Sequence, residues 1–128
     1  MKVAGFGFRS GATVADLRDV LALTGQTPDA VASISAKAQT PVLQQLAKEL
    51  DVPLIALDEN EIAGEQTLTC SPRIKARFGT GSLAEAAAQA GARTSVKGAT
   101  VRLLSPRVIT ANGNATVAIA QATAKGRT

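Results

Sequence analysis

The chain has 128 residues, of which 45% are hydrophobic and 19% charged; this is enough apolar sequence to form the core of one domain, and it excludes wholesale disorder. Histidine is absent and Cys70 is the single cysteine, which excludes a Ser-His-Asp or Cys-His catalytic arrangement, a zinc site of histidines or thiolates, and an internal disulfide. We therefore predict a single domain over residues 1–128 without a bound metal or cofactor.

The net charge of +4 is unevenly distributed along the chain. Residues 1–65 carry nine acidic and five basic side chains, whereas residues 66–128 carry nine basic ones and a single acidic one, Glu85. The two halves therefore have net charges of −4 and +8. Such an asymmetry predicts a positive surface and an anionic partner.

The apolar segments are too short for export or membrane insertion. The run at residues 3–8 is too short for a signal peptide, and no segment approaches the roughly 18 apolar residues that span a bilayer. A lone cysteine is typical of a reducing compartment. We expect a cytoplasmic protein that does not interact with a membrane.

The first helix and strand have clear boundaries. Residues 3–8 form an apolar run that predicts a buried strand. Residues 14–23 then place apolar side chains at helical spacing, with Thr13 and Asp16 as an N-terminal capping box and Gly25 as the stop.

The alternation of strand and helix then repeats. Residues 30–34 predict a second strand, and Thr40-Pro41 opens a helix that reaches Leu50. A third strand is expected over residues 54–57, followed by a short helical turn over 58–62 that Asp58 and Glu61 cap.

The second half is less regular. Residues 64–81 predict a loop holding a short helix around 73–77, and an alanine-rich helix over 84–90 should end at Gly91. Residues 100–104 and 116–120 predict two strands joined by the turn signal Asn112-Gly113-Asn114. The fold class is α/β: a three-layer α/β/α sandwich around a mostly parallel, mixed sheet with a C-terminal antiparallel hairpin.

Two glycine-rich segments could bind an anion. Gly5-Phe6-Gly7 follows the start of a strand, but the third glycine of a dinucleotide fingerprint would fall on Ser10, and no acidic residue ends the second strand. The alternative is that these glycines allow close packing. Gly79-Thr80-Gly81-Ser82 lacks the lysine of a P-loop, and it either offers N–H groups to an anion at a helix start or only caps the helix through Ser82 and Glu85.

Polar side chains also follow two of the predicted parallel strands. Arg9 and Ser10 follow the first strand, and Ser33 and Lys37 lie at and after the end of the second. Ligands of open α/β sheets bind at the carboxyl ends of strands, so these residues are candidates, although exposed loop positions would explain each of them singly. Cys70 lacks a base partner and is interpreted as a small buried or loop residue.

Motifs along nearly the whole chain, in order, resemble a known family. They are 5–11 (GFGFRSG), 32–37 (ASISAK), 46–54, 71–75 (SPRIK), 79–88 (GTGSLAEAAA), 103–107 (LLSPR) and 115–120 (ATVAIA). The chain is similar to the CobE-type cobalamin-biosynthesis proteins, which are similar to the C-terminal domain of cobalt-precorrin-5A hydrolase. Arg107 occupies a position where that family usually has lysine, and Phe8 one where it often has cysteine.

The resemblance implies a protein of cobalamin (vitamin B12) biosynthesis that handles an anionic corrin-ring intermediate of the precorrin or hydrogenobyrinic-acid type. Other enzymes of the pathway are possible partners. The resemblance covers only the C-terminal domain of that hydrolase, so the resemblance alone does not assign its lactone-opening activity to this chain. The predicted ligand-binding residues are Arg9, Ser10, Ser33, Lys37, Thr80, Gly81, Ser82, Glu85 and Arg107; no catalytic residue is assigned.

Three functions stay open at this point. The first is a carrier, chaperone or accessory factor without catalysis of its own. The second is a pathway enzyme acting on a side chain or lactone, with Glu85 and Lys37 as acid/base groups. The third, nucleic-acid binding, would explain the basic second half, but no recognition motif supports it and stacking aromatics are few, so we expect no nucleic-acid partner.

Overall fold

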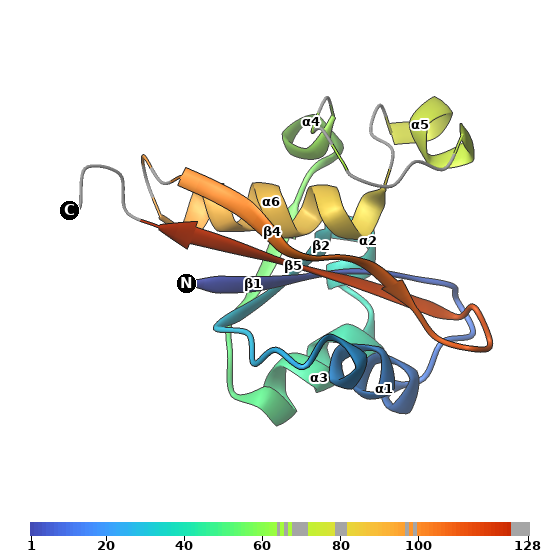
Figure 1. Cartoon of the computed structure of the whole chain (residues 1–128). Helices are drawn as coiled ribbons and strands as arrows, with labels where there is room; N and C mark the ends of the chain where they lie inside the picture. The colour runs from blue at the N-terminus through green and yellow to red at the C-terminus, as the bar shows by residue number, and fades with distance from the viewer. Residues whose placement is uncertain are drawn as a thin grey trace.

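A computed structural model describes residues 1–63, 65, 67, 72–78, 82–96, 98 and 100–123, and it contains five strands and six helices in these ranges (Figure 1). In chain order these elements are β1 (Lys2–Phe8), α1 (Val14–Thr24), β2 (Ala30–Ile34), α2 (Ser35–Ala38), α3 (Pro41–Leu50), β3 (Leu54–Leu57), α4 (Glu59–Ile62), α5 (Pro72–Phe78), α6 (Leu83–Ser95), β4 (Thr100–Ile109) and β5 (Ala115–Thr123).

The strands form one mixed sheet in the order β3-β2-β1-β5-β4. The pairs β1–β2 and β2–β3 are parallel, whereas β5 is antiparallel to both β1 and β4. Helices α1 and α3 cover one face, and α4, α5 and α6 lie on the other (Figure 1). The predicted three-layer architecture with its C-terminal antiparallel hairpin is confirmed.

Local capping signals mark the starts of α1 and α4 in the first half of the chain. Thr13 and Asp16 form a reciprocal capping box at the start of α1, and Gly25 ends the helix with a φ of 67°, which glycine adopts readily. The box of Asp58 and Glu61 at α4 is also present. Thr40 is the N-cap residue of α3, but its hydroxyl donates to the Lys37 carbonyl (2.6 Å) and makes no capping bond.

The prediction that Gly91 ends the alanine-rich helix is wrong, because α6 continues to Ser95. The glycine is needed for packing. A Cβ at residue 91 would lie 3.0 Å from the Ala32 Cβ and 3.1 Å from the Val3 Cγ1, so a side chain there would press α6 away from the sheet. Tertiary packing here overrides the low helix propensity of glycine.

The last two strands are longer than the sequence predicted. The expected end of the first at residue 104 is wrong, since β4 runs through Pro106 to Ile109. Proline lacks an N–H and is tolerated in a strand at an edge or a bulge. Here β4 is the edge strand, and its pairing with β5 shifts register between Leu103 and Ser105 and again between Ser105 and Val108.

The sheet has a buried core on each face, and the face under α6 depends on a very close approach at Gly5. A Cβ on Gly5 would lie 2.2 Å from the Ala84 carbonyl oxygen and 2.3 Å from the Ala88 nitrogen. Gly5 therefore allows the first turns of α6 to rest on β1, which supports the packing interpretation of Gly5-Phe6-Gly7 over the dinucleotide one. Among the described residues, no helix has the length and apolar character needed to cross a membrane.

Candidate functional site

A cavity of about 460 Å³ opens where β1 and β2 end and α6 begins. The cavity lies beside β1. From β1 the chain first adds β2 and β3 on one side of the sheet and later adds β4 and β5 on the other side. This is the position at which open α/β sheets bind ligands. The described residues that line the cavity are Gly7, Phe8, Arg9, Ile34, Lys37, Ile74, Leu83, Ala84, Arg107, Gly113, Asn114 and Thr116.

Lys37 reaches the cavity from α2, a single helical turn that directly follows β2 and that the sequence did not predict. Its ammonium donates a hydrogen bond to the Phe8 carbonyl and lies 4.9 Å from the centre of the Phe8 ring. The bond and the cation–π contact hold the half-buried side chain across the end of β1. An ammonium has three N–H groups, and among the described residues one of them is used, in the bond to the Phe8 carbonyl.

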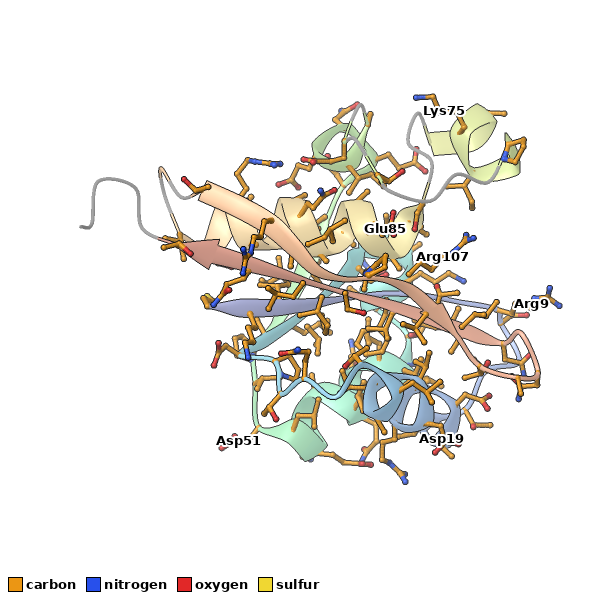
Figure 2. All side chains as sticks on the ribbon, in the orientation of Figure 1. Arg9, Asp19, Asp51, Lys75, Glu85 and Arg107 are labelled. Carbon is orange, nitrogen blue, oxygen red and sulfur yellow. The ribbon has the colours of Figure 1, made fainter. Side chains whose placement is uncertain are left out.

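Arg107 enters from the edge strand β4 and is fixed by a contact to α6. Its backbone N–H donates to the Glu85 carboxylate (Oε2) at 2.8 Å. Glu85 is fully buried on the first turn of α6, and Figure 2 shows the two residues close together at that end of the helix. The half-buried Arg107 side chain lines the cavity.

Arg9 is an exposed residue in the turn after β1 and belongs to the cavity lining; Figure 2 shows it at the end of the sheet, apart from Glu85 and Arg107. Its backbone N–H donates to the Asn114 carbonyl at 2.9 Å, so the β4–β5 turn is tied to the end of β1. Thr116 strengthens this link, because its hydroxyl donates to the Gly7 carbonyl at 3.0 Å. The exposed Ser10 is next to Arg9 but does not belong to the described lining.

The structure thus brings three of the predicted ligand-binding residues, Arg9, Lys37 and Arg107, to one cavity. Ser33 and Ser82 are fully buried outside the described lining. The Ser33 hydroxyl donates to the Phe6 carbonyl (2.8 Å), and the Ser82 hydroxyl accepts from the Glu85 N–H (3.3 Å). Glu85 is also outside the described lining. The predictions for Thr80, Gly81 and Cys70 lie outside the described residues.

Several lining residues were not predicted from the sequence. Phe8 and Thr116 belong to strands, and Asn114 belongs to the turn that the Asn-Gly signal did predict. Three apolar side chains form a wall: Ile34, Ile74 and Leu83. Nothing in local sequence distinguishes these three from ordinary core residues: Ile34 ends β2, whereas Ile74 lies in α5 and Leu83 begins α6.

Asp16 forms hydrogen bonds with the β4–β5 turn, which borders the cavity. Its carboxylate accepts from the Thr13 N–H (2.9 Å), the Asn112 amide (3.1 Å) and the Asn114 amide (3.5 Å). These bonds, the Thr13 N–H foremost and the Asn112 amide next, hold the pKa of Asp16 below its ordinary value of 3.8. They favour the ionised form because each donates a hydrogen to the carboxylate.

The lowered pKa of Asp16 predicts a pH-dependent stability. A carboxyl whose folded pKa lies below its unfolded pKa stabilises the protein above the unfolded pKa, and this contribution is lost as the pH falls through the folded one. We expect Asp16→Ala to be less stable than the wild type at pH 7, and the difference to shrink on acidification below pH 3.8. Urea unfolding of both proteins at pH 7 and pH 3 measures this. An equal difference at both values would contradict it.

Within the described ranges, no group of three or more His, Cys, Asp or Glu side chains is arranged to hold a metal ion. The described lining of the candidate site combines three cationic residues with apolar ones.

Comparisons with known proteins agree on one family. The family model described as cobalamin synthesis G C-terminus matches residues 2–120. The crystal structure of CobE, a protein from the cobalamin (vitamin B12) biosynthetic pathway, is similar with a TM-score of 0.83 and 31% identity, covering 99% of this chain and 93% of that one. Cobalamin biosynthesis protein chiG from Agrobacterium tumefaciens str. C58 is similar with a TM-score of 0.67 and 32% identity, covering 94% of this chain and 98% of that one.

No curated protein matches the chain. The family model nevertheless spans most of it, and both solved structures share its fold over nearly their full length. The chain belongs to the cobalamin synthesis G C-terminus family, a family of cobalamin biosynthesis.

Proposed function

We propose that this protein binds an anionic corrin-ring intermediate, of the precorrin or hydrogenobyrinic-acid type, in the cavity at the end of β1 and β2. The observation that carries the proposal is the charge of that cavity. Arg9, Lys37 and Arg107 all line it, and none of the described lining residues is acidic. Three cations around one small cavity favour a ligand with several negative groups.

The chemistry of the cations suits carboxylates. Corrin precursors carry acetate and propionate arms that are ionised near neutral pH. The guanidinium of Arg107 can bind a carboxylate through two parallel N–H groups, whereas the Lys37 ammonium acts as a compact charge. Since both side chains are half-buried, their attraction for a carboxylate is screened less than it would be on an open surface.

The apolar wall supports the macrocycle part of the proposal. Three apolar residues line the same cavity: Ile34, Ile74 and Leu83. They could contact the apolar ring of a ligand while the cations bind its charged arms. Phe8 is the aromatic residue of the described lining, but its ring lies near the Lys37 ammonium. Contacts with aliphatic side chains, rather than stacking on an aromatic ring, would therefore hold the macrocycle of the ligand.

We place the protein as a carrier, chaperone or accessory factor that passes its ligand to other enzymes of the pathway. The described lining offers no carboxylate, thiol or imidazole as an acid/base group. Glu85 was a candidate for that role, but it is fully buried and accepts a hydrogen bond from a backbone amide. Lys37 is engaged with the Phe8 carbonyl. These contacts favour binding without turnover.

The test is a titration of the purified protein with precorrin and hydrogenobyrinic-acid species, followed by visible absorbance and by mass analysis of the recovered ligand. We expect a saturable spectral shift at micromolar protein and an unchanged ligand mass. A changed mass would make the protein an enzyme of the pathway. If no intermediate bound, the direct corrinoid role would be refuted.

A further inference from the structure

Glu85 is the single acidic residue of residues 66–128, and the fold buries it completely. It lies on the first turn of α6 among alanines that pack against the sheet. Burial of a carboxylate is unfavourable unless its oxygens accept hydrogen bonds. One such bond comes from the Arg107 backbone N–H, 22 residues later, at 2.8 Å. Glu85 thus joins the helix start to the strand that supplies a cation to the cavity.

The Arg107 segment of β4 needs such a contact because its pairing with β5 is irregular. Between Ser105 and Val108, β4 advances three residues while β5 advances two, from Ile119 to Val117. The extra residue forms a β-bulge that includes Pro106, which has no N–H to pair. Bulges redirect the side chains next to them. The direction in which Arg107 leaves the strand therefore depends on what holds the bulge.

We infer that Glu85 is a positioning residue for the binding site: by accepting the Arg107 N–H it fixes the β4 bulge and keeps the Arg107 guanidinium at the cavity, without itself contacting the ligand. The inference rests on the proposed function, since it assigns a role within the same site. It differs from the acid/base role considered for Glu85, in which the carboxylate would exchange a proton with the ligand.

The Glu85→Gln and Glu85→Ala variants separate these two roles. Glutamine keeps an oxygen that can accept the Arg107 N–H, whereas alanine keeps none. We expect Glu85→Ala to raise the Kd for a hydrogenobyrinic-acid species about tenfold, the scale of one charge-assisted hydrogen bond. Glu85→Gln should bind within about threefold of the wild type. If Glu85→Gln bound as weakly as Glu85→Ala, the charge or proton of Glu85 would be what counts, and the inference would be overturned.

A double-mutant cycle tests whether Glu85 acts through Arg107. In the Arg107→Ala background, adding Glu85→Ala should cause no further loss of affinity, because the group that Glu85 positions is already gone. If the affinity losses of Glu85→Ala and Arg107→Ala multiplied in the double variant, the inference would be overturned. Asp58→Ala is the matched control, since it removes a capping carboxylate at α4, outside the described cavity lining. It should leave the Kd unchanged.

Hydrogen exchange of the Arg107 amide, followed by NMR, makes the result independent of any corrinoid. Glu85→Ala should accelerate that exchange at least about tenfold, and Asp58→Ala should not. If no intermediate binds the wild type, the proposed function fails, while accelerated exchange would still support the link between Glu85 and the bulge. Unchanged exchange of the residue 107 amide in a folded Glu85→Ala protein would refute the positioning role.

Discussion

The Gly5→Ala variant is expected to lose about 3 kcal/mol of its free energy of unfolding, or to fail to fold, because it overpacks a site where two backbones meet. The added Cβ would lie 2.2 Å from the Ala84 carbonyl oxygen and 2.3 Å from the Ala88 nitrogen. Both are main-chain atoms of α6, so relief requires the helix to move away from β1. Such a shift would also displace the start of α6, where Leu83 and Ala84 line the cavity.

Two other glycines serve as controls for this prediction. A Cβ at Gly11 would meet nothing within 4 Å, so Gly11→Ala should change stability by no more than about 0.5 kcal/mol. At Gly7 the nearest atom is the Thr116 hydroxyl at 3.0 Å, a side chain that can shift, so an intermediate loss is expected. Urea unfolding of the three variants gives the comparison. Equal stabilities for Gly5→Ala and Gly11→Ala would show that α6 does not approach β1 as described.

Removing the cationic side chains of the cavity is expected to weaken ligand binding strongly. Lys37→Ala and Arg107→Ala should each raise the Kd for a hydrogenobyrinic-acid species about tenfold, and the double variant about 100-fold, since each loses a charge-assisted hydrogen bond to a carboxylate. Arg107→Lys keeps the positive charge but not the two parallel N–H groups, so its loss should be smaller than that of Arg107→Ala. Absorbance titration measures all four.

The control for net charge is Lys48→Ala. Lys48 is exposed on α3, which lies on the face of the sheet opposite α6 (Figure 1). The Lys48→Ala variant should bind the hydrogenobyrinic-acid species like the wild type, even though its net charge falls by the same amount as in Lys37→Ala. Added salt should weaken wild-type binding through screening. Equal losses in Lys48→Ala and Lys37→Ala would mean that overall charge, not the cavity, attracts the ligand.

Some parts of the site could be predicted because their signals are local. Arg9 and Lys37 follow the first two strands, and the carboxyl ends of parallel strands meet at one edge of a sheet. Apolar runs identified those strands. Arg9 and Lys37, which follow them, both line the cavity at that edge of the sheet. Ser33 has the same sequence context, but a strand places successive side chains on opposite faces, and its hydroxyl is turned to the Phe6 carbonyl.

Glu85 shows where a local signal led to an incomplete interpretation. Ser82 and Glu85 have the spacing of a capping box, and the Ser82 hydroxyl does accept the Glu85 N–H. The Glu85 carboxylate also accepts from Arg107 on a distant strand. A motif indicates which bonds a side chain can make within its own turn, but not which strand will lie against that turn.

By itself the sequence determined the existence of the five strands and of every described helix except α2, the turn at Asn112-Gly113-Asn114 and the charge of the second half. Each of these depends on neighbours a few residues apart, through hydrophobic period, capping and turn chemistry. Only the tertiary structure decided that α6 runs through Gly91, that β4 passes Pro106 with bulges, and that Lys37 and Arg107 share one cavity. These outcomes depend on backbones that approach from distant parts of the chain, and no local pattern encodes their separation.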